Sequence, residues 1–350
     1  MRILVINPGS TSTKIGLFLN NNLILNKTFR HTSEEIGQFN NVTSQYNFRL
    51  SIIEDFLKNT ETDINSLNAV VGIGGLIRPV KGGTYIVNEK MVNELKQGMH
   101  GEHASNLGAI LAYYFAKKIN KQAFISDPVV VDEFNEIARI SGHPKFERRS
   151  IFHALNQKAI AYKYSKEINK PYNNLNLIVV HMGGGISVGA HQKGNVIDAN
   201  NALNGDGPFT PERSGSLPVA QLVDTCFGGE YTKQQVHSMI LGKGGLVAYC
   251  GTNNLSELES KNDPQVNYIL QAMAYQISKE IGFVAPVMKG DIDAILLTGG
   301  IAHSKLITDE IISRVSFIAP VRLYPGEDEL KALAESAIRV LTGKEAPKTY

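Results

Sequence analysis

The stretch RILVINPGSTSTK, residues 2–14, decides the fold that we expect for this chain. It opens with a short apolar run, Ile3 to Ile6, which has the length of one buried strand. A Pro-Gly pair, four consecutive hydroxyl side chains and Lys14 follow, and a second apolar run, residues 15–19, comes directly after them. The pattern predicts two strands joined by a tight polar hairpin. Such a hairpin is suited to hold an anion through its hydroxyls, its lysine and its free backbone N–H groups. The alternative is an ordinary Ser/Thr-rich turn, and the spacing of a Walker loop is absent.

A second copy of this pattern lies half a chain away. The apolar run 176–181 leads into a glycine-rich segment, residues 182–189, and a turn at 192–195 leads to a third strand at 196–198. Residues 2–29 have the same order of strand, hairpin, strand, turn and strand. Two such meanders predict a duplicated domain, with two hairpins that would hold a polyphosphate from both sides of a cleft.

A third glycine element follows the apolar run 294–297. Its last residues, Gly299 and Gly300, precede a predicted helix. Glycines at this point would let a flat nucleoside approach the backbone closely.

Composition limits the classes of protein to which the chain can belong. With 350 residues and 43% hydrophobic residues, the chain is long enough for two globular domains. A net charge of +2 gives no nucleic-acid footprint. No apolar run approaches the roughly 18 residues that span a bilayer, and the N-terminus does not resemble a signal peptide. The two cysteines, Cys226 and Cys250, have no metal-binding spacing, so we expect a protein of the reducing cytoplasm.

Three further residues are site candidates in their own right. Asp127 follows a predicted strand at 123–125, and ligands bind at the carboxyl ends of strands in α/β sheets. A helix cap or a turn aspartate is its alternative. Arg213 lies in a Gly/Pro-rich loop, residues 201–218, where it is either a surface arginine or a guanidinium fork for a planar anion. His153 opens a long helical stretch, and a lone histidine there is more often structural than catalytic.

Seven motifs, in this order, resemble those of butyrate kinases in the acetate/butyrate kinase family. They cover essentially the whole chain: INPGSTSTK (6–14), GEHASNLG (101–108), DPVVVDE (127–133), SIFHALNQKA (150–159), HMGGGIS (181–187), NALNGDGPFTPERSGSLP (201–218) and LTGGIAH (297–303). The family belongs to the superfamily of acetate and sugar kinases, heat-shock chaperones and actin.

The resemblance implies an α/β fold with duplicated actin-like ATPase domains, which are ribonuclease H-like. Each has a mixed five-stranded sheet flanked by helices, and the nucleotide cleft lies between them. Because the last helix returns to the first domain in this family, we expect residues 1–153 with 328–350 as the first domain and residues 154–327 as the second.

The implied activity is direct in-line transfer of the ATP γ-phosphoryl group to butyrate, or to isobutyrate and other branched acids. Both reactants are anions, and a carboxylate is already ionised near neutral pH. The site therefore needs cations, hydrogen-bond donors and Mg²⁺ rather than a strong base. We expect ATP, Mg²⁺ and a short-chain carboxylic acid as the partners of a cytoplasmic homodimer or larger homo-oligomer, with no nucleic acid and no membrane.

The resemblance also assigns roles to individual residues. Those facing phosphate or metal from the first domain are Asn7, Ser10, Ser12 and Lys14. Those holding Mg²⁺, directly or through water, are Asn7, Asp127 and Glu329, with Asp328 as the alternative to Glu329. Those stabilising the transferring phosphoryl group are His153 and Arg213. Those binding ATP from the second domain are His181, Gly183, Gly184, Gly185, Gly299 and Gly300. His103 is placed near the acyl substrate; its H-x-x-H spacing with His100 does not predict a metal site.

One position departs from the family pattern. Where family members resemble V-G-R-G-G, residues 71–75 read Val-Gly-Ile-Gly-Gly, so Ile73 replaces the arginine expected at the substrate carboxylate. Losing one such contact costs on the order of 10²–10³ in rate. Arg78 is a possible substitute five residues on. The alternative function is therefore an ATP-binding protein of the same fold with weak or lost kinase activity. A chaperone-like or filament ATPase lacks support, and a polyol substrate, for which Asp127 could be the base, is the test against a carboxylate acceptor.

Overall fold

The computed structural model describes residues 1–350 and forms two compact units. The first unit contains residues 1–131 and 328–350, and the second contains residues 132–327. Our expectation placed the first boundary after residue 153. Residues 132–153 lie in the second unit because their hydrogen bonds go there: Val196 N–H donates to Glu133 over 2.8 Å, and Asn135 N–H donates to Ile197 O over 3.0 Å.

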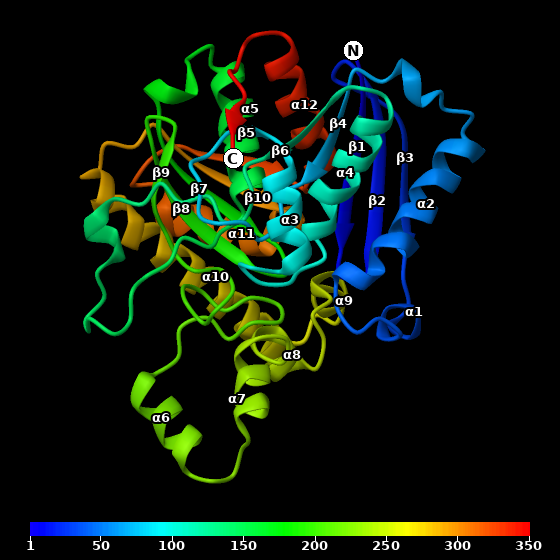
Figure 1. The fold of residues 1–350 in the computed structure, drawn as a ribbon. Coiled ribbons are helices and arrows are strands. Elements are labelled where there is room, and N and C mark those ends of the chain that lie inside the picture. The colour runs from blue at the N-terminus through cyan, green and yellow to red at the C-terminus, as the bar shows by residue number, and fades with distance from the viewer. The chain divides into compact units, whose positions relative to one another are not determined.

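The first unit is built on a seven-stranded sheet in the order β12-β5-β6-β4-β1-β2-β3 (Figure 1). Its strands are β1 (Arg2–Gly9), β2 (Ser12–Leu19), β3 (Asn22–Arg30), β4 (Ala69–Ile73), β5 (Thr84–Ile86), β6 (Gln122–Ser126) and β12 (Lys348–Thr349). The expected five strands are present, and the short β5 and β12 are additional. Strand β5 pairs antiparallel with β6, and β12 pairs parallel with β5. The backbone edge of β6 is therefore covered.

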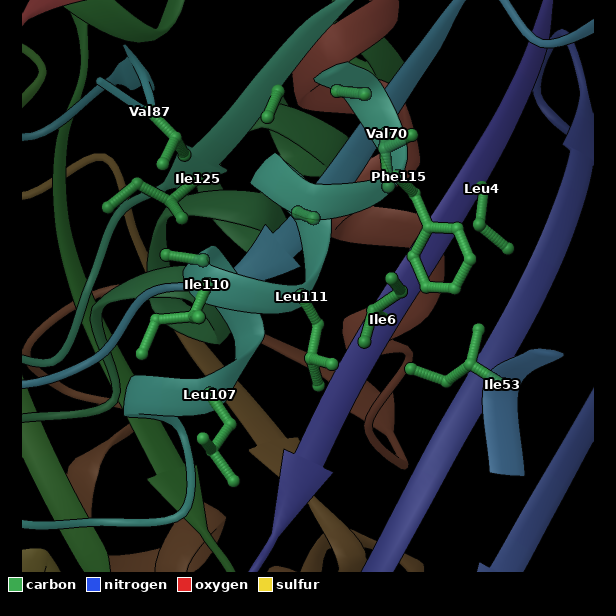
Figure 2. Close-up of a cluster of buried hydrophobic side chains, with 14 of the residues drawn as sticks. Leu4, Ile6, Ile53, Val70, Val87, Leu107, Ile110, Leu111, Phe115 and Ile125 are labelled. Carbon is green, nitrogen blue, oxygen red and sulfur yellow. The ribbon is translucent and has the colours of Figure 1, made fainter. Parts of the chain in front are cut away.

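Helices cover the sheet of the first unit. They are α1 (Ser33–Gly37), α2 (Tyr46–Asn59), α3 (Glu89–Gln97), α4 (Asn106–Lys118) and α12 (Glu329–Leu341), with short 3-10 turns η1 (Thr43–Gln45) and η2 (Ile64–Ser66). Figure 2 shows Leu111 and Phe115 of α4 beside Leu4 and Ile6 of β1, and Ile110 of α4 toward Ile125 of β6. This apolar layer holds β1 and its hairpin rigidly, because every one of these side chains is at most 3% exposed.

The second unit is built on a five-stranded sheet in the order β11-β10-β7-β8-β9. Its strands are β7 (Asn176–Met182), β8 (Ile186–Gln192), β9 (Asn195–Ala199), β10 (Ala294–Gly299) and β11 (Val321–Pro325). Its helices are α5 (Ala154–Glu167), α6 (Val219–Phe227), α7 (Lys233–Ile240), α8 (Gly245–Cys250), α9 (Leu255–Ser260), α10 (Pro264–Val284) and α11 (Lys305–Val315). Its 3-10 turns are η3 (Glu136–Arg139), η4 (Tyr172–Asn174), η5 (Ala285–Met288) and η6 (Gly300–His303).

The sequence of β7 is continuously apolar rather than alternating because both faces of the strand are covered. Leu177 and Val179 pack with α5, whereas Ile178 and Val180 pack with α10 and α11. A strand covered on both faces buries every side chain, as expected for the centre of a sheet that contains parallel pairs.

The two predicted meanders are both present. Strands β1, β2 and β3 pair antiparallel in one unit, and β7, β8 and β9 do so in the other. Each meander even has a register shift between its second and third strands, at Leu17/Phe18 and at Ala190/His191. The sequence repeat is therefore a structural repeat. No helix of either unit is long and apolar enough to cross a membrane.

Candidate active site

The hairpin between β1 and β2 carries polar side chains on its turn and on the strand ends beside it. Gly9 pairs with Ser12, so Ser10 and Thr11 form the turn, and Lys14 pairs with Asn7 across the strands. The amide Nδ2 of Asn7 donates to Oε2 of Glu329 over 2.7 Å, and Nζ of Lys14 lies 3.5 Å from the same oxygen. Three predicted site residues from opposite ends of the chain therefore meet at one point of the first unit.

Glu329 reaches this point because α12 starts there. The carboxylate of its neighbour Asp328 accepts a hydrogen bond from Lys331 N–H over 3.1 Å and is the N-cap of α12. Asp328 is thus occupied by its own helix, whereas Glu329 is directed at Asn7 and Lys14.

A buried arginine, which no sequence motif indicated, lies behind this hairpin. Arg49 of α2 is 0% exposed, and its guanidinium donates to Ser12 O over 2.6 Å and to Thr13 Oγ1 over 2.9 Å. It also donates to Gln45 over 2.9 Å, and no carboxylate lies within ion-pair distance of it. Burial lowers the pKa of Arg49 to about 10, so the group stays charged at neutral pH. The available signal was a cation on the apolar stripe of a predicted helix.

The carboxyl ends of the central strands of this sheet bring together Ile73 and Asp127. In register, Ile6 pairs with Gly72 on one side of β4, and Ile73 pairs with Ser126 on the other. Ile73 therefore ends the strand that lies between the strand of Asn7 and the strand preceding Asp127. Asp127 has φ +40° and is 5% exposed, and it accepts hydrogen bonds from Gly83 N–H over 2.7 Å and from Ser126 Oγ over 3.2 Å.

Arg78 does not lie beside Ile73 in the sheet. Its guanidinium carbon is 4.7 Å from the ring centroid of Tyr350, which follows the edge strand β12. That strand is three places from β4 in the sheet, roughly 14 Å at the usual strand spacing. The structure therefore gives no support for Arg78 as a substitute for the missing arginine.

His103 lies in the loop before α4. Its Nδ1 accepts from Ser105 N–H over 3.2 Å and lies 2.8 Å from Ser105 Oγ. Desolvation lowers its pKa below the ordinary value of 6.5. The loop is tied to the segment after Ile73, because Asn106 Oδ1 accepts from Leu76 N–H over 2.8 Å.

The hairpin between β7 and β8 is built differently, because its glycines leave room for side chains from elsewhere. A Cβ at Gly185 would lie 2.1 Å from Nη1 of Arg213 and 3.2 Å from Cε1 of His153. A Cβ at Gly183 would lie 2.8 Å from Oε1 of Glu327 and 3.1 Å from Nε2 of His181. Side chains larger than hydrogen at these two positions would displace the predicted site residues.

Arg213, a predicted site residue, lies beside the β7–β8 hairpin. Its Nη1 donates to Ala202 O over 2.5 Å, while its buried Nε has no hydrogen-bond partner. The loop that carries it is closed by Thr210, whose hydroxyl donates to Gly184 O over 2.7 Å and accepts from Arg213 N–H over 3.0 Å. Burial lowers the pKa of Arg213, and the charge of Glu212 acts in the opposite direction. A half-buried guanidinium that makes only one hydrogen bond within the protein, through Nη1, suits an anionic ligand.

His153 and His181 form a stacked pair beside this arginine. Their ring centroids are 3.8 Å apart and their planes differ by 17°. Burial, then the neighbouring His181 and Arg213, holds the pKa of His153 well below 6.5. His181 is anchored through Nδ1 to Asn156 Oδ1 at 2.9 Å, and its Nε2 lies 3.3 Å from Glu327 Oε1. Glu327 was not among the predicted site residues.

The third glycine element is explained in part by packing. Gly299 has φ +91°, and a Cβ there would lie 2.3 Å from Met182 O, so this glycine permits close contact between β10 and β7. Gly300 begins η6, and a Cβ there would have no neighbour within 4 Å. Of this pair, only Gly300 has open space beside it.

Around the two hairpins, the predicted site residues form two sets, each within one unit. The first set contains Asn7, Ser10, Ser12, Lys14 and Glu329, with Arg49 behind it. The second set contains His153, His181, Gly183, Gly184, Gly185 and Arg213, with Glu327 in addition. No group of three or more His, Cys, Asp or Glu side chains in the chain is arranged to hold a metal by protein ligands alone.

Comparison with known proteins identifies a family and several similar structures. A profile described as the acetokinase family matches residues 144–331. The acetate kinase of Porphyromonas gingivalis superposes with a TM-score of 0.80 at 15% identity, covering 97% of this chain and 99% of that one. The propionate kinase of Francisella tularensis subsp. tularensis SCHU S4 gives 0.69 at 18% identity, covering 96% and 98%. The acetate kinase of Entamoeba histolytica gives 0.74 at 15% identity, covering 97% and 99%. These likenesses show that the fold is the duplicated actin-like ATPase fold.

Proposed function

The chain belongs to the acetokinase family, and we propose that it transfers the γ-phosphoryl group of ATP to a four-carbon carboxylic acid, butyrate or isobutyrate. Membership makes it a phosphotransferase with a carboxylate acceptor. The four-carbon substrate rests on the butyrate-kinase character of the seven motifs. The observation that carries the proposed chemistry is the half-buried guanidinium of Arg213, which makes one hydrogen bond within the protein, beside the stacked His153 and His181.

This arrangement suits phosphoryl transfer to a carboxylate. The transferring group carries negative charge on its equatorial oxygens, and a catalyst needs positioned donors there. Arg213 supplies a fixed positive charge, and His153 supplies a neutral imidazole at neutral pH, because its pKa is depressed. Asp127 would be the base for a hydroxyl acceptor. A carboxylate acceptor, which needs no base, is favoured over a polyol because the chain matches the acetokinase family.

The first unit's residues fit a magnesium ion that is held mainly by water and phosphate. Mg²⁺ keeps several waters and is usually bound through one or two carboxylates together with substrate phosphates. Glu329, with Asn7 beside it, offers one such carboxylate near Lys14 and the hydroxyl-rich turn. The ion would neutralise charge on the transferring phosphates. We propose Glu329 and Asn7 as its nearest protein groups and Asp127 as a contact through water.

Ile73 favours a second candidate function. At the carboxyl end of β4 the side chain is the apolar Ile73, where the family pattern has an arginine. The guanidinium of Arg78 lies over the ring of Tyr350 instead. We therefore also consider an ATP-binding protein with weak kinase activity. An Ile73→Arg variant separates the two: a gain of tenfold or more in kcat/KM supports the weakened enzyme, whereas no gain eliminates it.

The deciding experiment is ATP-dependent acyl phosphate formation with Mg²⁺, trapped by hydroxylamine. Acetate, propionate, butyrate, isobutyrate and valerate are compared at equal concentrations. The proposal expects the highest kcat/KM with a four-carbon acid, although one methylene contributes only about 1–3 kcal/mol of discrimination. A maximum at acetate would refute the substrate assignment. No product with any acid, together with measurable ATP binding, would leave the second candidate.

We also propose that the protein is a homodimer formed through an arm, residues 217–241, that carries α6 and α7. The arm extends away from the sheet of its unit (Figure 1). No residue of α6 is buried, and Val219 and Phe227 are 74% and 86% exposed. Val219, Val223 and Phe227 lie at one-turn intervals on one face of α6, and an exposed apolar face of this kind is typical of an interaction surface. The arm contains only two acidic residues and one lysine, so a second copy would not be repelled.

A Phe227→Asp variant tests this interface, and we expect it to elute as a monomer in size-exclusion chromatography with light-scattering detection. An unchanged mass would refute the interface.

A further inference from the structure

A chain of buried polar side chains runs behind His153. It starts at Tyr172 in η4, passes through His191 on β8 and Gln157 on α5, and ends at Ser187 on β8, next to His153. Gln157, Ser187 and His191 are all 0% exposed. Each neighbouring pair is hydrogen bonded. Tyr172 Oη lies 2.7 Å from His191 Nδ1, and His191 Nε2 lies 2.9 Å from Gln157 Oε1. Ser187 Oγ lies 2.8 Å from Gln157 Nε2 and 2.8 Å from His153 Nδ1.

Strand geometry and one glycine make this chain possible. Ser187 and His191 lie on the same face of β8, because side chains alternate along a strand. Gly189 lies between them, and a Cβ there would be 2.4 Å from Gln157 Oε1 and 3.2 Å from His191 Nε2. Gln157 follows His153 by four residues, about one helical turn, and so spans both groups of β8 from α5.

The direction of donation is determined at the glutamine. Gln157 Nε2 lies 3.1 Å from the backbone carbonyl of Ser187, which can only accept. The amide nitrogen must therefore face Ser187, and its oxygen faces His191. Because that oxygen only accepts, His191 carries a proton on Nε2. Burial, and secondarily the charge of Lys158, keeps the pKa of His191 well below 6.5, so its Nδ1 is unprotonated and accepts from Tyr172.

The hydroxyl of Ser187 donates its hydrogen bond to Nδ1 of His153, for the following reason. Its oxygen accepts from Gln157 Nε2 over 2.8 Å and from the backbone N–H of His153 over 3.3 Å. Both lone pairs are then used, and the single hydroxyl proton is available only for His153 Nδ1. Nδ1 is thus an acceptor, and the proton of the neutral ring lies on Nε2. No protein group accepts from this Nε2–H.

We propose that Tyr172, His191, Gln157 and Ser187 form a one-way hydrogen-bond relay that holds His153 in its Nε2–H tautomer, so that the ring donates to a substrate anion. Gln157, Ser187 and His191 are positioning residues, because they act through His153. The receiving anion is an oxygen of the transferring phosphoryl group, and this second part rests on the proposed function. His153 faces His181 of β7, Arg213 of the loop and Ser187 of β8, so the relay is the only hydrogen-bonded support of its Nδ1.

The tautomer can be measured without any assay of activity. In protein labelled with ¹⁵N-histidine, the two ring nitrogens are distinguished by their chemical shifts and long-range couplings, and the His153 signals are identified by their loss in His153→Asn. The expected result at pH 7 is a neutral ring with its proton on Nε2. A proton on Nδ1, or a doubly protonated ring, would overturn the proposal even in an active enzyme. An Nε2–H tautomer in a protein without kinase activity would support the relay and refute the proposed function.

Two variants test the catalytic consequence. Ser187→Ala removes the donor to Nδ1, and Gln157→Glu reverses the direction because a carboxylate cannot donate to Ser187. Both should reduce kcat by about 10–100-fold, the loss typical when a residue that orients a metal-bound histidine is removed, with KM for ATP and acid changed by less than about threefold. Gln157→Glu should also shift the His153 signal toward the Nδ1–H or doubly protonated form.

Ser278→Ala is the matched control in the same unit, because its buried hydroxyl donates only to Ala274 O of its own helix. If Ser187→Ala retained both the Nε2–H tautomer and the kcat of Ser278→Ala, the relay would be refuted. If Gln157→Glu did not fold, as judged by its thermal unfolding, Ser187→Ala and the spectrum of the unaltered protein would still decide.

Discussion

The two hairpins of the molecule have the same strand order and use it in opposite ways. The β1–β2 hairpin of the first unit presents side chains of its own, and a buried cation, Arg49, holds its backbone from behind. The β7–β8 hairpin of the second unit has almost no side chains of its own and makes room for those of other segments. Arg213 reaches it from a loop, and His153 from the start of α5. A duplicated fold thus provides the same backbone twice, while packing decides which chain segment supplies the chemistry.

This difference predicts that glycine substitutions matter most in the second hairpin. In Gly185→Ala the added Cβ would lie 2.1 Å from Arg213 Nη1, so the guanidinium must move. We expect a loss in kcat on the order of 10²–10³, as for removal of one transition-state donor. Gly184→Ala should have a much smaller effect, because its Cβ would lie 3.5 Å from Glu212 Oε1, an ordinary contact. Steady-state kinetics of both variants checks this. Equal losses would show that Arg213 is not the group that Gly185 protects.

The first hairpin should instead be sensitive to the cation behind it. Arg49→Met removes the guanidinium that donates to the carbonyl of Ser12 and to the hydroxyl of Thr13, which keeps only its hydrogen bond with His31. We expect a loss of about 2–4 kcal/mol in the free energy of unfolding and about a tenfold higher KM for ATP. Urea denaturation and steady-state kinetics measure the two effects. Arg2→Met, at the opposite end of β1 and exposed, is the control. A stability loss with an unchanged KM would limit Arg49 to a structural role.

A smaller effect distinguishes two adjacent carboxylates of the first unit. Glu329→Gln removes the charge beside Asn7 and Lys14, and we expect about a tenfold higher Mg²⁺ concentration for half-maximal rate. Asp328→Asn should leave the Mg²⁺ dependence nearly unchanged, because asparagine caps a helix about as well as aspartate. Titration of Mg²⁺ at fixed ATP separates them. The reverse order of effects would assign the metal side to Asp328.

An effect on stability alone, with no change in catalysis, is expected at Glu280 of α10 and depends on pH. Burial, with Asp206 and Asp198 nearby and Arg148 opposing, raises the pKa of Glu280 to about 7. The folded protein therefore retains a proton that the unfolded chain releases near pH 4.5. The free energy of unfolding consequently falls as the pH rises from about 4.5 to about 7. Glu280→Gln removes this loss. We expect it to be about 1–3 kcal/mol more stable than the unaltered protein at pH 8, with the difference vanishing near pH 4.5. Urea denaturation at both pH values checks the sign, and equal stability at pH 8 would contradict the raised pKa.

The sequence by itself was sufficient for the fold class and the family. Apolar runs of strand length before Asn7-Pro8-Gly9 and Met182-Gly183-Gly184 predicted both hairpins, because a buried strand and a turn each have a local chemical signature. The order of seven motifs then indicated a carboxylate kinase, and the acetokinase match is consistent with it. The individual site residues, the four-carbon substrate and the dimer remain predictions.

Only the tertiary structure showed what each residue contacts. Arg49 and Ser12 are 37 residues apart and Asn7 and Glu329 are 322 apart, and no local pattern records such contacts. The direction of the relay through Gln157 depends on which atoms face one another across α5 and β8. Local sequence determines strands, turns and caps because these depend on neighbours along the chain. Contacts between distant side chains depend on strand register and helix packing, which exist only once the whole unit has folded.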